Sequence, residues 1–106
     1  MVEVKFTEQA ITDLDDIAEY ITRDSSFYAG MQVHKLILKT DILEQFPKVG
    51  RIVPELRNKF IRELIEGNYR IVYRIVNKNL VHILTFHHSR KKFKSSTIRK
   101  LIKKNK

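Results

Sequence analysis

Three strand-like runs in the second half of the chain constrain its fold more than any other feature. The runs are "FIRELIE" (60–66), "YRIVYRIV" (69–76) and "LVHILTFHH" (80–88), and "GN" and "NKN" separate them. β-Branched and aromatic residues dominate the runs, as is typical of strands. Both separators have the length and residue types of hairpin turns. The sequence therefore predicts a three-stranded antiparallel meander.

A first strand and two amphipathic helices are expected before the meander. Residues 2–6, "VEVKF", alternate apolar and polar side chains, as in a strand. Thr7 is a plausible cap for a first helix, and a second helix follows the interruption at 23–26 and runs to about Phe46. The expected buried stripes are Ala10, Leu14, Ile17, Ala18 and Ile21, then Val33, Leu36, Ile37, Leu43 and Phe46. Because the link is short, the two helices should form an antiparallel hairpin.

The order of elements is therefore β-α-α-β-β-β, which predicts an α+β fold. We expect one sheet of four strands with the helical hairpin on one face, and a long loop over residues 46–59. At 106 residues the chain is long enough for one domain and too short for two. We assign residues 1–91 to that domain and 92–106 to a basic C-terminal extension, whose apolar spacing is compatible with a short helix.

The positive charge of the chain is concentrated at its C-terminus. Residues 1–48 hold 5 Lys/Arg and 9 Asp/Glu, residues 49–88 hold 7 and 3, and residues 89–106 hold 9 and 0. The net charges are therefore −4, +4 and +9. This gradient favours a basic end that faces a polyanion, and a solvated, solubilising tail is the alternative.

Other classes of protein are disfavoured by what the sequence lacks. Without cysteine the chain has no disulfide framework and no thiolate metal site. The first ten residues carry no basic-then-apolar leader, and no run approaches the roughly 18 apolar residues that span a bilayer. We expect a cytoplasmic protein that does not contact membranes.

The central strand-like run raises a question about its second face. Alternation places Tyr69, Ile71, Tyr73 and Ile75 on one face, and Arg70, Val72, Arg74 and Val76 on the other. If "NKN" is a three-residue loop, the next strand adds His82 and His88 to the arginine face, with Leu84 and Phe86 as an apolar floor. The "GN" turn adds Arg62 to that face if it has three residues, and Glu63 if it has two.

Arginine and histidine side chains over an apolar floor are suited to cleaving or binding a phosphodiester. Cleavage by a 2′-hydroxyl needs a base, an acid and a cation beside the developing charge, and Glu55, His88 and Arg70 could supply them. No metal or cofactor is expected, since His82 and His88 lie at opposite ends of their strand. The alternative is a solvated outer face whose arginines pair with Glu63 or Glu66 across strands.

The motifs "VPELRNKFIREL", "GNYRIVYRI" and "LVHILTFHHSR" resemble those of the RelE/ParE superfamily, the toxins of type II toxin–antitoxin modules. The resemblance covers about residues 2–91 and includes "TEQAITDLDDIAEYI" and "FPKVGRIVPEL". It implies a cognate antitoxin whose acidic segment wraps the toxin and covers the Arg70 face or displaces the tail. It also implies one of two targets. RelE and YoeB branches cut mRNA in the ribosome, whereas the ParE branch is associated with poisoning DNA gyrase.

The resemblance also assigns roles to residues. Matched to the YoeB-like pattern, Glu55 falls on the general base, Arg70 on the phosphate-stabilising arginine and His88 on the C-terminal histidine. Ser89 stands where that pattern has a terminal tyrosine. Further residues expected to contact phosphate are Arg51, Arg62, Arg74, Arg90 and Lys91. The leading hypothesis is a metal-independent, ribosome-dependent mRNA endoribonuclease. The alternatives are a gyrase poison without nuclease activity and a degenerate toxin that retains only antitoxin binding.

Overall fold

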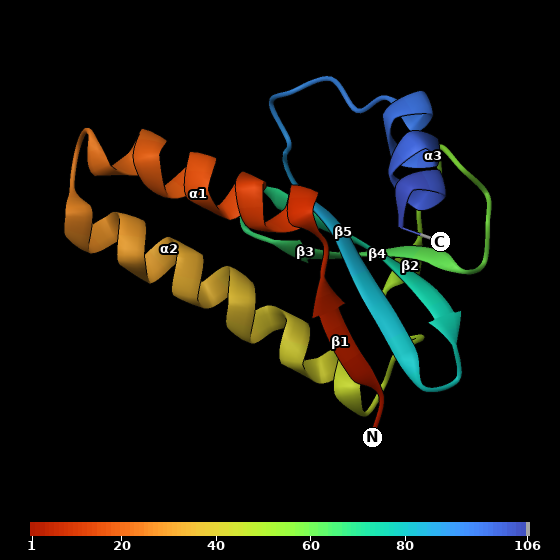
Figure 1. Cartoon of the computed structure of the whole chain (residues 1–106). Coiled ribbons are helices and arrows are strands. Elements are labelled where there is room, and N and C mark those ends of the chain that lie inside the picture. The colour runs from red at the N-terminus through yellow and green to blue at the C-terminus, as the bar shows by residue number, and fades with distance from the viewer. Residues whose placement is uncertain (106) are drawn as a thin grey trace.

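A mixed five-stranded sheet runs through the molecule (Figure 1). The hairpin of helices α1 (Glu8–Thr22) and α2 (Ser26–Lys39) lies on one side of it, and helix α3 (Ser95–Lys104) lies on the other. The computed structural model describes residues 1–105. The strands are β1 (Glu3–Phe6), β2 (Arg51–Ile52), β3 (Ile61–Glu66), β4 (Tyr69–Asn77) and β5 (Leu80–His88), in the order β1-β5-β4-β3-β2. β1 is parallel to β5, and all other pairs are antiparallel. The predicted α+β fold and its C-terminal meander are confirmed.

The helical hairpin begins at a cap that also ties it to the sheet. Helices α1 (Glu8–Thr22) and α2 (Ser26–Lys39) are followed by a 3₁₀ helix, η1 (Thr40–Glu44). The Thr7 hydroxyl accepts a hydrogen bond from the backbone N–H of Ala10, which satisfies an otherwise free donor of the first turn. The same hydroxyl lies 2.8 Å from the carbonyl oxygen of Ile83, so the start of α1 is held against β5.

The hairpin buries one face of the sheet, which we call the inner face. The largest fully buried side chains between the hairpin and this face are Leu36, Leu43, Ile71, Tyr73 and Ile83. Ile37 and Phe46, expected in the buried stripe of the second helix, are exposed. Ile37 is rotated by about 100° from Leu36 on the helix, which turns it away from the sheet. Phe46 follows η1, where the tighter helical period ends the stripe at Leu43.

The expected loop over residues 46–59 contains β2, so the sheet has five strands instead of the four predicted. β2 pairs with β3 through only two residues. Just before it, the Tyr73 hydroxyl donates to the carbonyl of Pro47 at 2.7 Å and accepts from the Gly50 N–H at 2.9 Å. A Cβ on Gly50 would lie 2.6 Å from both the Tyr73 hydroxyl and the Glu63 carbonyl, so only glycine fits this approach.

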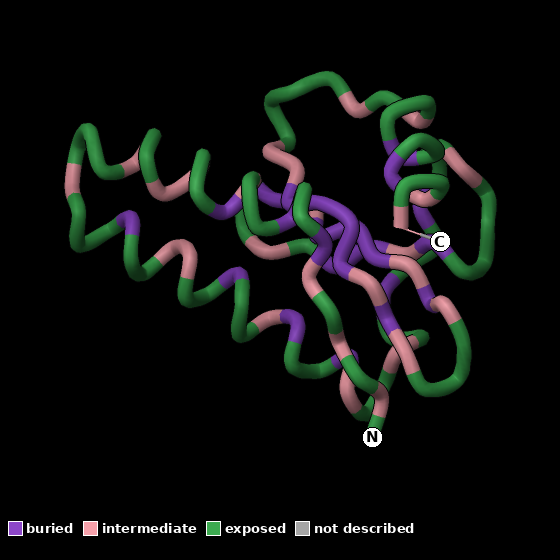
Figure 2. The backbone as a smooth tube through the Cα atoms, in the orientation of Figure 1, coloured by how far each residue is buried: buried purple, intermediate pink, exposed green. Residues whose placement is uncertain are grey.

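The other face of the sheet, here the outer face, is also covered, whereas the sequence predicted a helical cover on one face only. A second apolar cluster joins the sheet to the loop after β2 and to α3 (Ser95–Lys104). Its buried members are Val53, Ile61, Val72, Leu84, Ile98 and Leu101. Figure 2 shows buried and exposed segments alternating along α3, as expected for a helix that packs by one side only. The spacing that suggested a helix in the tail therefore marks a packed element.

Candidate functional site

The β3–β4 turn decides which side chains accompany Arg70 on the outer face. Glu66 pairs with Tyr69, so the turn has two residues, Gly67 and Asn68. Glu63 then pairs with Val72 and shares the outer face with Arg70. Of the two alternatives left open by the sequence, the structure has the one that brings a carboxylate beside the arginine.

His88 lies on the inner side of the sheet, so the expectation that it shares a face with Arg70 is wrong. The register between β4 and β5 shifts between Val72 and Tyr73, where β5 contains one extra residue, Leu84. A β-bulge of this kind moves the side chains that follow it, here from Phe86 onward, to the opposite face. His87 consequently pairs with Arg70, and His88 pairs with Tyr69. Phe86, predicted in the outer floor, belongs to the inner core for the same reason.

Arg70 is bound by two carboxylates. Its Nε lies 2.5 Å from Glu63 Oε1, and its Nη1 and Nη2 lie 3.0 and 2.9 Å from the two oxygens of Glu55. Glu63 in turn accepts from Arg51 Nε at 2.5 Å. We call these four residues the Arg70 cluster. The side chain of Glu63 is fully buried, so its charge depends on the two arginines that flank it.

An aromatic side chain from the C-terminal segment closes the Arg70 cluster. The centre of the Phe93 ring lies 4.0 Å from the guanidinium carbon of Arg70, a cation–π distance. The His87 ring packs edge-on against Phe93 with centroids 5.3 Å apart, and His87 Nε2 lies 2.8 Å from the Lys91 carbonyl oxygen. Only 15% of the Arg70 side chain is exposed as a result. Phe93 was not among the expected site residues, although it is the only aromatic residue of the basic tail.

The electrostatics of the cluster follow from these contacts. The hydrogen bonds from Arg70 lower the pKa of Glu55 from 4.5 to about 2, against a smaller opposing effect of burial. Glu55 in turn raises the pKa of Arg70, with a further contribution from Glu63. A carboxylate with so low a pKa is a weak proton acceptor at neutral pH, because general bases act best when their pKa lies near the working pH.

The five residues expected to contact phosphate do not gather at one place. Arg51 belongs to the Arg70 cluster, whereas Arg62 donates to the carbonyl oxygens of Lys59, Lys48 and Gly50. Arg74 pairs with His82 across the strands, as predicted. Burial, followed by the charges of Arg74 and Lys5, lowers the pKa of His82. Arg90 and Lys91 are exposed in the segment after β5.

His88 faces an open groove between α1 and the end of β5. The groove has a volume of about 610 Å³, and its lining includes Tyr20 of α1, Arg23 directly after that helix, Tyr69, His88 and Arg90. The His88 ring packs edge-on against the Tyr69 ring, with centroids 5.0 Å apart. Desolvation by burial lowers the pKa of His88. No group of three or more His, Asp or Glu within residues 1–105 could hold a metal ion, and no helix in that range is long and apolar enough to cross a membrane.

Comparison with known proteins identifies the class that this fold and these motifs define. Residues 4–93 match the family described as the ParE toxin of the type II toxin–antitoxin system parDE. The toxin RelE2 of Caulobacter vibrioides is 30% identical over 89 residues, which are 84% of this chain and 97% of that toxin. A chain of the chromosomal ParDE system from P. aeruginosa has the same fold, with a TM-score of 0.69 and 24% identity over 83% of this chain and 96% of that one.

The protein is therefore a type II toxin of the RelE/ParE superfamily. The resemblance of its sequence motifs indicated this superfamily, and the family match places the chain in the ParE toxin family within it. Membership implies a cognate antitoxin as partner. Helix α3 starts at Ser95 and so lies beyond the residues that match the family.

Proposed function

We propose that this toxin acts in the cytoplasm by binding and poisoning DNA gyrase, and that it does not cut mRNA. The observation that carries the proposal is the closed Arg70 cluster. An arginine that binds a phosphate needs an uncompensated charge that the substrate can reach. Here two carboxylates form ion pairs with Arg70, and the Phe93 ring covers its guanidinium group.

Two further features support a toxin that acts by binding. His88, the expected acid, lies across the sheet from Arg70 and Glu55, so the three expected catalytic residues do not surround a common phosphate. Glu55, with a pKa of about 2, is a poor base. The match to the ParE family points the same way, because the ParE branch is the one associated with gyrase.

A pair of assays on the purified toxin tests this proposal. We expect a supercoiling reaction with gyrase and relaxed plasmid to lose its supercoiled product and to accumulate gyrase-cleaved DNA. In a translation extract we expect the message to remain full length at the same toxin concentration. Cleaved mRNA together with undisturbed supercoiling would overturn the proposal.

A ribosome-dependent endoribonuclease is the second candidate, because the outer face still brings a histidine to the cluster. His87 pairs with Arg70, which holds Glu55, so a base, a cation and an imidazole share one face. Cleavage would require Phe93 to leave the Arg70 side chain. In the translation extract, loss of cleavage in His87→Gln but not in His88→Gln would support this site, and the reverse would support the His88 assignment.

The antitoxin is proposed to bind through an acidic segment. Residues 67–106 contain no aspartate or glutamate, so this part of the chain is strongly basic and attracts negative charge. A toxin–antitoxin complex that dissociates in concentrated salt would support an acidic contact. A complex whose affinity is insensitive to salt would contradict it.

A further inference from the structure

The side of α3 that faces away from the sheet carries only basic and small polar residues. We define the basic ridge as Arg99, Lys100, Lys103 and Lys104 of α3, together with Arg90, Lys91, Lys92 and Lys94 of the preceding segment. All eight side chains are exposed, and none forms an ion pair within residues 1–105. The ridge contains more than a third of the 21 basic residues of the chain and lacks acidic neighbours in sequence.

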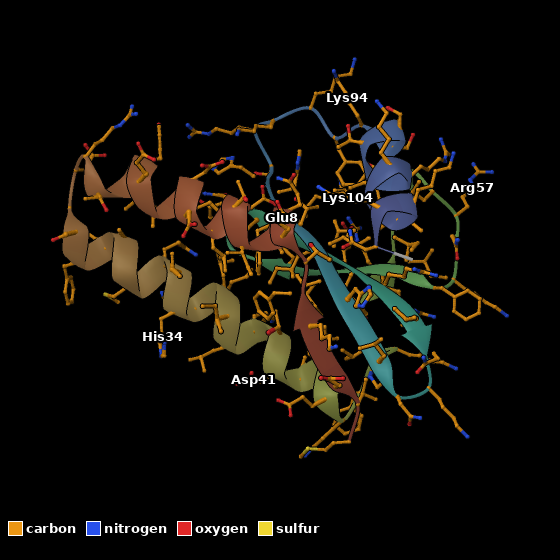
Figure 3. The ribbon with its side chains drawn as sticks, viewed as in Figure 1. Glu8, His34, Asp41, Arg57, Lys94 and Lys104 are labelled. Atoms are coloured by element: carbon orange, nitrogen blue, oxygen red, sulfur yellow. The ribbon has the colours of Figure 1, made fainter. Side chains whose placement is uncertain are left out.

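The geometry of α3 aligns these charges. Ile98 and Leu101 are 3% and 9% exposed and point to the sheet, and the four cations of the helix lie on the opposite side. Cations four residues apart on one side of a helix are about 6 Å apart along its axis. Lys94 and Lys104 are labelled near the two ends of α3 in Figure 3, so the ridge extends along the whole helix.

The cations of the ridge repel one another along the helix that carries them. Arg99 with Lys103, and Lys100 with Lys104, are like charges at i,i+4, a spacing that destabilises a helix. A bound polyanion would offset these repulsions through attraction between each cation and a phosphate, and binding would release the counterions condensed on the polyanion.

We propose that the basic ridge of α3 binds the phosphate backbone of duplex DNA. The choice of DNA rests on the proposed function, because gyrase presents duplex DNA to whatever binds beside it. Binding to the phosphate backbone is inferred from the ridge alone, because the ridge offers a row of cations and no aromatic side chain for stacking on unpaired bases. Phe93, the aromatic residue of this segment, is engaged with Arg70 and His87.

Two other classes of partner fit the ridge less well. A membrane-binding helix inserts its apolar side, and here Ile98 and Leu101 are buried against the sheet. A folded protein partner usually contributes and receives apolar anchors at the centre of an interface. The exposed side of α3 offers only serine and threonine between its cations.

Fluorescence anisotropy with a labelled duplex of about 20 base pairs, at salt from about 50 to 200 mM and without gyrase, tests the proposal. The test variant replaces Arg99, Lys100, Lys103 and Lys104 by glutamine. A matched control replaces one arginine and three lysines elsewhere, namely Arg23, Lys35, Lys48 and Lys78, by glutamine, which leaves the same net charge. Circular dichroism checks that both variants remain folded.

We expect the ridge variant to bind about tenfold or more weakly than wild type near 100 mM salt, with the slope of log K against log[salt] reduced by about 3. The control should stay within about twofold of wild type. Equal weakening of both variants would show that net charge alone governs binding and would overturn the ridge. Absence of wild-type binding at the lowest salt would also overturn it.

Duplex RNA and anionic lipid vesicles serve as the competing ligands in the same assay. Tighter ridge-dependent binding to either than to duplex DNA would overturn the assignment of DNA. Because gyrase is absent, the result is independent of the supercoiling assay. Intact gyrase activity with ridge-dependent DNA binding would overturn only the proposed function, and gyrase poisoning that persists without DNA binding would overturn only the ridge.

Discussion

The two faces of the sheet are buried by different means. The inner face is covered by α1 and α2, which meet it through a continuous set of apolar side chains. The outer face has a smaller apolar cluster, a buried carboxylate between two arginines, and a cover formed partly by the last helix of the chain. We therefore expect the inner face to stabilise the whole fold, and part of the outer cover to open locally while the sheet stays folded. Changes on the two faces should differ in size and in kind.

The largest effect is expected on the inner face. Leu36 is fully buried, so Leu36→Ala should lower the free energy of unfolding by about 2–5 kcal/mol through lost burial and a cavity. Its neighbour Ile37 is 40% exposed, and Ile37→Ala should cost about 1 kcal/mol or less. Urea denaturation followed by circular dichroism measures both. Equal losses at the two positions would contradict the assignment of the inner face.

Removal of the buried charge from the outer face should have the next largest effect. Glu63→Gln leaves Arg70 with Glu55 alone and Arg51 without its carboxylate, and we expect a loss of about 2–3 kcal/mol. Glu66→Gln, on the same strand, should cost about 0.5 kcal/mol or less. Urea denaturation compares the two variants. A Glu63→Gln protein as stable as wild type would mean that the cluster contributes nothing to the fold.

Loosening α3 should have a smaller effect that stays local. Leu101→Ala removes a contact of a ten-residue helix that is too short to be stable without packing, and we expect a loss of about 1–2 kcal/mol. Hydrogen exchange should quicken at the amides of α3 while the amides of β4 and β5 keep their wild-type protection. Faster exchange throughout the sheet would show that both faces unfold as one unit.

The inner face could be predicted from the sequence because periodicity alone determines it. Tyr69, Ile71 and Tyr73 alternate within one uninterrupted strand, and all three are buried under the hairpin. The pairing of β4 with β5 beyond the bulge could not be predicted from the sequence. The segment "ILTF" is apolar apart from Thr85, and nothing in its composition marks Leu84 as the extra residue or reveals the shift that exchanges His87 and His88.

The cover of the outer face was harder to foresee for a different reason. The spacing of Ile98, Leu101 and Ile102 indicates an amphipathic helix but does not say which surface receives it. The cover depends on Phe93 reaching Arg70 and on Val53 joining the same cluster, and both contacts join residues far apart in the chain. Glu55 and Arg70 were expected together, and their 2.9 Å contact also depends on where the loop after β2 folds back.

The smallest expected effect is a pH-dependent contribution to stability that exists on the outer face and not at Leu36 on the inner face. The pKa of Glu55 is about 2 when folded and near 4.5 when unfolded, so its ion pair stabilises the protein above pH 4.5 and loses that contribution as the pH falls towards 2. Because 39% of the Glu55 side chain is exposed, solvent screening limits the contribution to about 0.5–1 kcal/mol.

The stability difference between wild type and Glu55→Gln should therefore shrink between pH 4.5 and 2 and in concentrated salt. The difference between wild type and Leu36→Ala should not, since no charge changes at that position. Urea titrations at successive pH values measure both differences, and a Glu55 effect that is independent of pH would show that the ion pair with Arg70 does not stabilise the outer face.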